Sequence, residues 1–333
     1  MMNVAIASQC WDTPEASFYT HSREVLAAAL SAGVEARPMR LRSLRAIRTG
    51  GLVLPWARRW VDRYPRGAGE VVHHIDQDAF IGIDVATVHD LGCFHDPSVA
   101  ARFARSAVRA VTRRARRIVV TTRGTADELS TVFPRAPAAD VVPVPHASVR
   151  PGLEQPCRFD ALWVGRNAPH KRAAEYVRLA ARWPRLAFAM RLSASPSRPL
   201  MDGLGPLLPL RNLTLLTEPM TEAEMDALYR QSRVVVSTST YEGYHRPPLE
   251  GYLRGCRVVL PRTEPYLSTY PEDAVFWYSR GAARADPESL DSALEDAIGR
   301  TEPAMPDSSV VRAVSYETTG AALRGVYEGA SRA

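Results

Sequence analysis

The chain has 333 residues, of which 46% are hydrophobic and 23% charged, an ordinary composition for a soluble globular protein with two domains. No apolar run approaches the ~20 residues that cross a bilayer. The N-terminus lacks the basic start and apolar stretch of a secretory signal. Its four cysteines have no C-x-x-C spacing, which argues against a metal knuckle or a disulfide framework. We therefore expect a cytoplasmic protein.

The positive charge is concentrated in one half of the chain. Residues 1–150 contain 20 arginines and 14 acidic residues, whereas residues 151–333 contain 22 basic and 22 acidic residues. The whole net charge of +6 therefore belongs to the N-terminal half, which we expect to meet an anionic partner. Lys171 is the single lysine beside 41 arginines, and its neighbourhood favours a functional role.

Short apolar runs alternate with amphipathic stretches in the first half of the chain. The predicted strands, in order, are 3–8, 34–41, 70–75, 84–88 and 117–121, and the predicted helices are 21–32 and 98–115. Strands that alternate with helices pair in parallel, so the fold class is α/β with a doubly wound sheet. We assign residues 1–150 to an N-terminal Rossmann-like domain.

A second alternating set follows the proline-bearing stretch 151–156. Its predicted strands are 161–165, 187–192, 213–216, 234–237, 257–260 and 274–278, and its helices are 173–183, 222–231 and 249–254. We assign residues 151–308 to a second Rossmann-like domain. A last helix over 316–330, within 309–333, is long enough to cross back to the first domain. In such sheets ligands bind outside the carboxyl ends of the strands.

The segment TYEGYHRPPLEGYLRGC, residues 240–256, is the strongest site signal. Glu242 lies in a turn after a strand, and Pro247 and Pro248 open a helix, where proline is tolerated. A diphosphate fits such a helix start near Pro248. Glu242 and Glu250 offer acceptor oxygens to sugar hydroxyls. The alternative is that Glu250 caps the helix and Glu242 is a solvated turn residue.

Two further loops carry candidate site residues. In WVGRNAPHKR, residues 163–172, Arg166 and Lys171 follow a strand and can clamp a diphosphate, unless they belong to a solvated basic loop. His89 and Asp90 follow another strand at its carboxyl end. The D-x-D at 76–78 falls in a loop, so we expect no metal site and no bound cofactor there.

The acceptor side is predicted from arginine and tryptophan patterns in the first half. One face of the helix 98–115 carries Arg105 and Arg109 among several arginines, and Trp56 and Trp60 recur among arginines further upstream. These patterns fit a solvated basic face, a surface for anionic membrane lipids, or a surface for nucleic acid phosphates. Peripheral contact with the inner face of a membrane is therefore one of the expectations.

These segments together resemble the retaining glycosyltransferase family 4, which has the GT-B fold. The resemblance rests on the order and spacing of VATVHDLGCFHDP, ARRIVVTTRGTADEL, ALWVGRNAPHKR, DALYRQSRVVVSTSTYEGYHRPPLEGYLRGCRVV and VSYETTGAALRGVYEGA, from about residue 70 to the end. It implies two Rossmann-like domains facing across a cleft, with residues 1–150 on the acceptor side and residues 151–308 binding the nucleotide-sugar donor. It also implies transfer of a sugar from a nucleotide diphosphate sugar to an acceptor hydroxyl, with retention of configuration and without metal.

The resemblance also implies a role for each matching residue. Glu242 would contact the hydroxyls of the transferred sugar, together with the adjoining Gly243, Tyr244 and His245. Glu250 would contact the ribose. The diphosphate would lie against Arg166, Lys171 and the helix start at Pro248, and His89 would lie against the sugar. A phosphate oxygen of the donor would take the proton of the acceptor.

The chain departs from the family pattern at several places. The loop over residues 8–20 lacks the glycines that usually lie close to the donor phosphates. His245 and Arg246 stand where the family commonly has a glycine and an apolar residue, so the donor sugar stays open.

Several functions remain open at this point. We expect a glycan or lipid-linked saccharide as acceptor, with DNA base modification as an alternative. A nucleotide-sugar epimerase or phosphorylase and a non-catalytic basic nucleic-acid-binding protein are further alternatives. Loss of donor turnover on replacing Glu242 or Lys171 would separate a transferase from the binding protein.

Overall fold

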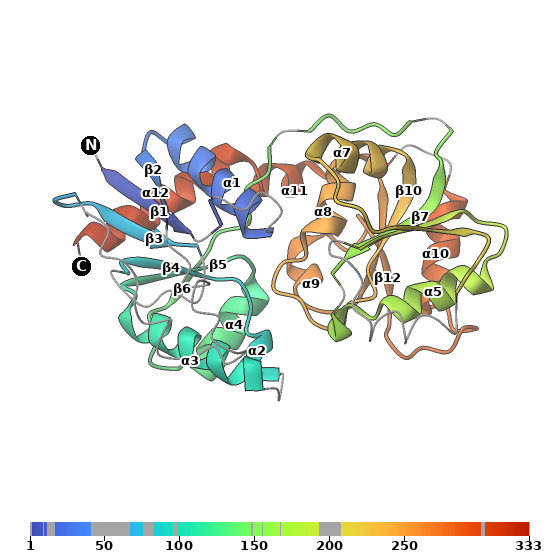
Figure 1. The fold of residues 1–333 in the computed structure, drawn as a ribbon, viewed down its shortest axis with the longest axis horizontal. Coiled ribbons are helices and arrows are strands. Elements are labelled where there is room, and N and C mark those ends of the chain that lie inside the picture. The colour runs from blue at the N-terminus through green and yellow to red at the C-terminus, as the bar shows by residue number, and fades with distance from the viewer. Residues whose placement is uncertain are drawn as a thin grey trace. The chain divides into compact units, whose positions relative to one another are not determined.

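The computed structural model describes residues 2–8, 10–11, 17–40, 67–75, 83–95, 99–147, 149–154, 156–166, 168–192, 208–300 and 304–332. Trp56, Trp60 and the D-x-D at 76–78 lie outside the described residues. The chain divides into two compact units. Unit 1 comprises Met1–Ser148 and Arg312–Ala333, and unit 2 comprises Val149–Val311. Each unit contains one six-stranded sheet with helices on its faces (Figure 1).

The sheet of unit 1 is parallel throughout, in the order β2-β1-β3-β4-β5-β6. Its strands are β1 Asn3–Ser8, β2 Glu35–Arg40, β3 Val71–His74, β4 Val85–Val88, β5 Arg117–Val120 and β6 Ala139–Val141. The first five confirm the predicted strands, with ends that shift by one residue at most. The short edge strand β6 was not predicted. Chain order reverses between β1 and β3, which makes their carboxyl ends a ligand-binding position.

Helices from both ends of the chain cover one face of this sheet. They are α1 Ser17–Ser31 and α12 Tyr316–Arg332, which lie side by side (Figure 1). Val25 of α1 and Leu323 of α12 are buried in one cluster with Ile6 of β1. The opposite face is covered by α3 Val99–Arg114 and α4 Arg123–Val132, through Val108, Val111 and Leu129 among others. The last helix of the chain is therefore part of the core of unit 1.

The sheet of unit 2 is also parallel throughout, in the order β12-β11-β10-β7-β8-β9. Its strands are β7 Phe159–Gly165, β8 Phe188–Leu192, β9 Leu213–Leu216, β10 Ser232–Val236, β11 Arg257–Pro261 and β12 Phe276–Tyr278. Numbered within the unit, this is the order 3-2-1-4-5-6 of dinucleotide-binding sheets. The prediction of two α/β doubly wound sheets is therefore confirmed. The switch point of unit 2 lies between β7 and β10.

Two helical layers enclose the second sheet. On one face α5 Ala173–Arg182 and α10 Leu290–Gly299 bury Tyr176, Val177 and Leu294 against the strands. On the other face, α7 Glu222–Arg230 buries Leu228 and Tyr229 in a cluster with Leu162 of β7 and Val235 of β10. This second face also carries α8 Arg246–Leu253, whose Gly251 packs directly against Val235. We call it the α7/α8 face.

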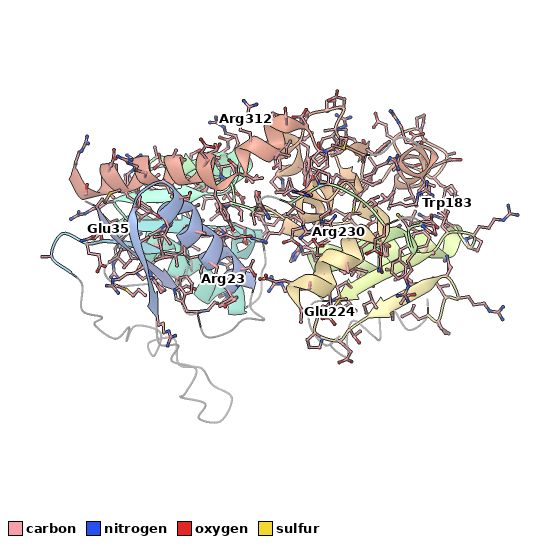
Figure 2. All side chains as sticks on the ribbon, turned by 90° about the horizontal axis from the view of Figure 1, so that it is seen from above. Arg23, Glu35, Trp183, Glu224, Arg230 and Arg312 are labelled. Atoms are coloured by element: carbon pink, nitrogen blue, oxygen red, sulfur yellow. The ribbon has the colours of Figure 1, made fainter. Side chains whose placement is uncertain are left out.

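Local sequence signals explain where several of these helices begin. Thr221 and Glu224 form a capping box at the start of α7, on which Figure 2 labels Glu224 and Arg230. The short helices are α2 Gly92–His95, the 3-10 turn Pro169–Lys171, α9 Tyr266–Thr269 and α11 Ser308–Ala313. In the described parts of the chain, no helix combines the length and apolarity needed to cross a membrane.

Candidate functional site

The loops that follow β7 and β10 meet at the switch point of unit 2. After β7 the chain passes Arg166 and enters the 3-10 turn that ends with Lys171, and after β10 it runs from Ser237 to Glu242. The Thr240 amide donates to the His170 carbonyl at 2.7 Å, and the Thr238 hydroxyl donates to the Lys171 carbonyl at 2.8 Å. These bonds hold the two predicted motifs together in one place.

Lys171 and Glu242 form a buried ion pair between these two loops. Lys171 Nζ lies 2.5 Å from Glu242 Oε1, and each side chain is only 10% exposed. Burial opposes ionisation of the carboxyl, but His245 and the Lys171 ammonium together hold the pKa of Glu242 below its ordinary value. Glu242 is therefore a carboxylate at neutral pH. The sole lysine of the chain and the first glutamate of the 240–256 segment are thus direct partners.

His245 adds a buried imidazole to this pair. Its Nδ1 lies 2.6 Å from the Tyr266 hydroxyl, which in turn lies 2.8 Å from the hydroxyl of Ser237. Nε2 lies 3.7 Å from Glu242 Oε1, and no described residue forms a hydrogen bond with it. Burial lowers the pKa of His245 to about 3, so the ring is neutral at pH 7. Because a carboxylate faces Nε2, we place the proton there, which leaves Nδ1 as an acceptor for Tyr266.

The backbone of His245 is strained. Its φ of 57° lies in the left-handed region, where a non-glycine residue costs about 1 kcal/mol or more. A glycine would adopt this conformation freely, and glycine is the residue that the family pattern usually has here. The imidazole is kept at a conformational cost, and it faces Glu242. We therefore count His245 among the site residues.

Helix α8 starts directly after His245, three residues earlier than predicted. Arg246 is its first residue, so Pro247 and Pro248 occupy the next two positions of the first turn. Prolines carry no N–H, and this helix start therefore offers fewer amide donors than an ordinary one. The direction of the helix dipole still favours an anion at this end.

Both carboxylate oxygens of Glu250 have partners in unit 2. The Tyr229 hydroxyl donates to Oε2 at 2.9 Å, and Arg246 Nε donates to Oε1 at 3.1 Å. Glu250 is therefore fixed between α7 and α8 rather than capping the helix. A carboxylate has about four lone-pair sites, so it can still accept from a ligand hydroxyl.

The remaining predicted donor residues differ in exposure. Gly243 is buried and Tyr244 is half-buried, and both lie in the turn between Glu242 and α8. Arg166 is exposed, and among the described residues no ion pair of its guanidinium is found. It therefore remains available to an anionic ligand at the carboxyl end of β7.

In unit 1, His89 directly follows β4. Its Nε2 donates to the Ile75 carbonyl at 2.7 Å, and the His21 ring meets it edge-on with centroids 5.0 Å apart. Burial lowers the pKa of His89 more than the Ile75 carbonyl and Asp90 raise it, so the ring is neutral at pH 7. Asp90 Oδ1 accepts from the Gly92 amide at 2.9 Å and so shapes the turn before α2.

The predicted basic face belongs to α3. Arg102, Arg109, Arg113 and Arg116 are exposed, whereas Ala107, Val108, Val111 and Ala115 are buried, as the helical pattern predicted. Arg105 donates to the Cys93 carbonyl at 2.9 Å, and Arg109 lies over the Phe94 ring. These two arginines therefore also attach α3 to the segment around α2.

Sequence reasoning missed Ser237 and Tyr266, which hold His245. Tyr266 lies 21 positions beyond His245 on α9, and no local pattern connects the two. In the part of the chain described, no three His, Cys, Asp or Glu side chains gather as metal ligands.

The whole chain is similar in fold to solved glycosyltransferase structures. It matches HepE from Anabaena, solved with UDP and glucose, with a TM-score of 0.71 and 13% identity over 98% of this chain and 100% of that one. It matches sucrose-phosphate synthase from Thermosynechococcus elongatus with a TM-score of 0.68 and 14% identity, over 100% and 97% of the two chains. It matches WaaG, a glycosyltransferase involved in lipopolysaccharide biosynthesis, with a TM-score of 0.61 and 12% identity, over 99% of this chain and 98% of that one.

These likenesses concern the fold. Together with the two parallel six-stranded sheets, they confirm the predicted GT-B fold. No protein-family model matches the sequence, and no curated protein matches it either.

Proposed function

We propose that this chain is a glycosyltransferase that moves a sugar from a nucleotide diphosphate sugar to an acceptor hydroxyl. The observation that carries the proposal is the buried Lys171–Glu242 pair, held at the switch point of unit 2 by the loops after β7 and β10. Switch points are where doubly wound sheets bind nucleotides. A carboxylate and an ammonium there supply an acceptor for sugar hydroxyls and a cation for a diphosphate.

Each site residue has a role in this proposal. Glu242, kept ionised at neutral pH, accepts hydrogen bonds from the transferred sugar, and Glu250 accepts from the ribose. Lys171, Arg166 and the start of α8 near Pro248 stabilise the negative charge that develops on the leaving diphosphate. Contact of the transferred sugar with His89 of unit 1, the role that the resemblance implies, stays a prediction. Transfer proceeds without metal and with retention, through a path in which a donor phosphate oxygen takes the proton of the acceptor.

Three of the similar solved structures support a choice of donor and acceptor classes to test. HepE and the pneumococcal O-GlcNAc transferase GtfA were both solved with UDP, so UDP-sugars are the donors to test first. WaaG acts in lipopolysaccharide biosynthesis, which supports a glycan or lipid-linked saccharide as the acceptor class. The exposed arginines of α3 would favour an anionic acceptor or the surface that carries it.

The test is a transfer and hydrolysis assay with UDP-, GDP- and ADP-sugars, followed by NMR of the product anomer. We expect one donor base to be preferred. Glu242→Gln keeps the size of the side chain and removes its charge, so turnover should fall at least about 100-fold. Glu295→Gln, on an exposed position of α10, is the matched control and should leave turnover unchanged.

Two outcomes would contradict the proposal. Full turnover in Glu242→Gln would show that this site does not take part in the reaction. Conversion of the donor sugar into a different sugar, without any acceptor product, would favour the epimerase alternative. An inverted anomer would overturn retention alone.

A further inference from the structure

Arg191 is a buried arginine in the strand β8 of unit 2, which has the sequence Phe-Ala-Met-Arg-Leu. Only 7% of the residue is exposed. Among the residues that the structure describes, its buried Nε and Nη1 atoms have no hydrogen-bond partner. Burial lowers the pKa of Arg191 from its ordinary value, and no neighbouring carboxylate offsets this. Buried cations are almost always paired, so this one calls for an explanation.

The strand register places Arg191 at the carboxyl end of the sheet, in line with the site. Arg191 pairs with Val164 of β7, one residue before the end of that strand. Leu162 pairs with Val235 of β10, so two residues further along Val164 is level with Ser237. Ser237, Val164 and Arg191 therefore form a row across three neighbouring strands. The two ends of the row lie about 10 Å apart, which is two strand spacings.

All three residues of this row point to the α7/α8 face. Side chains alternate along a strand, and Val164, Ala189 and Val235 belong to the cluster on that face with Tyr229 of α7. Arg191 lies two positions after Ala189 and Ser237 two positions after Val235, so both share the face. At one end of the row, Ser237 contacts His245, which faces Glu242. Glu250 is bonded to Tyr229 on the same face. Arg191 lies at the other end of the row.

We infer that Arg191 binds the nucleoside end of the donor, donating hydrogen bonds to the carbonyl oxygens of its base. The inference rests on the proposed function, which assigns the sugar to Glu242, the diphosphate to Lys171 and the ribose to Glu250. A nucleotide that follows this order from β10 toward β8 brings its base to the carboxyl end of β8. The guanidinium there has unused donors, and it pairs with no acid that a base would have to displace.

The arrangement also explains why an unpaired cation is retained. An unsatisfied buried donor destabilises a protein, and an apolar residue of the same shape would remove that cost. Recognition groups are commonly kept at the expense of stability. We therefore expect Arg191 to contribute more to the free energy of ligand binding than to the free energy of folding. A structural arginine would do the reverse.

The experiment measures binding of UDP, UMP and uridine to the full chain by calorimetry, with competition against UDP for weak ligands. Arg191→Met should weaken all three ligands by the same factor, at least about tenfold, because all three share the base. The melting temperature of Arg191→Met should be equal to that of the wild-type chain or higher. Arg191→Gln, which retains a donor, should fall between the two proteins in affinity, and it serves as the readout if the Met variant does not fold.

The matched control is Arg233→Met. Arg233 is also a strand arginine, on β10, but it is bonded to Asp160 at 3.2 Å and to the Ile298 carbonyl at 2.8 Å. Its replacement should lower the melting temperature and leave nucleotide affinity unchanged.

The outcomes distinguish this inference from the proposed function. If the wild-type chain binds none of the three ligands or any other nucleotide, the proposed function itself fails. If it binds them and Arg191→Met binds equally well, only the Arg191 inference is overturned. A loss that grows from uridine to UMP to UDP would assign Arg191 to the phosphates and would also overturn it.

Discussion

Both units contain a buried, neutral histidine that is held by side-chain hydroxyl groups. In unit 1, His73 lies between the Tyr327 hydroxyl, 2.9 Å from Nδ1, and the Thr87 hydroxyl, 2.8 Å from Nε2. In unit 2, His245 is held by Tyr266 and Ser237. Burial is the main cause that lowers the pKa of both rings to about 3, compared with about 6.5 in an unfolded chain.

These two histidines predict a loss of stability in mild acid. Between pH 6.5 and about 3 the unfolded chain binds protons that the folded histidines do not, so the free energy of unfolding falls as the pH falls. At pH 5 the loss should be about 2 kcal/mol per histidine. Calorimetric melting at pH 7 and pH 5 checks this. His73→Gln should reduce the pH dependence of unit 1. An unchanged pH dependence in His73→Gln would contradict the assignment.

The Lys171–Glu242 pair predicts strong coupling in stability. Lys171→Met leaves a buried carboxylate without its cation and should cost about 3 kcal/mol or more. Glu242→Gln in the same chain removes the stranded charge, so the double variant should regain much of that loss. Urea unfolding of the two single variants and the double variant measures the coupling. Additive losses would show that the two side chains do not interact in solution. The double variant should remain inactive although its fold is restored.

At the scale of single residues, the sequence pointed to individual charged residues but not to their contacts or backbone conformations. Lys171 and Glu242 were identified because rare or acidic residues after strands are visible in the sequence. The contact between them, 71 positions apart, was not visible. Neither was the left-handed backbone of His245, because it depends on the burial of the ring. Arg191 could not be distinguished among 41 arginines, because only its burial and missing partners set it apart.

At the scale of elements, the contact of α12 with α1 depends on one glycine. A Cβ at Gly320 would lie 2.2 Å from the Ala28 carbonyl oxygen, which belongs to the backbone of α1 and cannot move aside cheaply. Gly320→Ala should therefore destabilise unit 1 by about 2 kcal/mol or more. Thermal unfolding measures this loss.

Gly325 provides the control on the same helix. A Cβ there meets nothing within 4 Å, so Gly325→Ala should stabilise α12 by about 0.5–1 kcal/mol through helix propensity alone. If both substitutions changed stability in the same direction, close packing of α12 on α1 would be refuted.

The elements that were predicted are those with strong local patterns. Buried strands such as β4 and β11 are continuous apolar runs, and α3 has a clear amphipathic period, so each was located to within a residue or two. The edge strand β6 has only three residues, none of them buried, and gives no such pattern. The helix α4 was missed because Gly124 weakens its first turn, although Thr122 caps it. The start of α8 was placed too late, at residue 249, although Pro247 and Pro248 were expected to open the helix.

At the scale of the whole molecule, the two units differ in how the chain builds them. Unit 2 is one continuous segment, Val149–Val311, whereas unit 1 joins Met1–Ser148 to Arg312–Ala333. The C-terminal segment gives unit 1 the buried Leu323, Val326 and Tyr327 of α12, including the hydroxyl that binds His73. The residues that we propose for donor binding, Lys171, Glu242 and Arg191, all belong to unit 2. We therefore expect folding of unit 1 to require both ends of the chain, and donor binding to require unit 2 alone.

This division predicts how fragments behave. Residues 149–311 should fold alone and bind the preferred nucleotide, because their core and donor residues are complete. Residues 1–148 should not fold, since they leave the α12 side of the core uncovered. Joining 1–148 to 312–333 by a short Gly/Ser linker should restore folding, because the His146 amide donates to the Val314 carbonyl at 2.8 Å and the two segments already meet there. Circular dichroism and calorimetric melting distinguish these fragments. A cooperative transition in 1–148 alone would show that α12 is dispensable, and an unfolded 149–311 would show that unit 2 depends on unit 1.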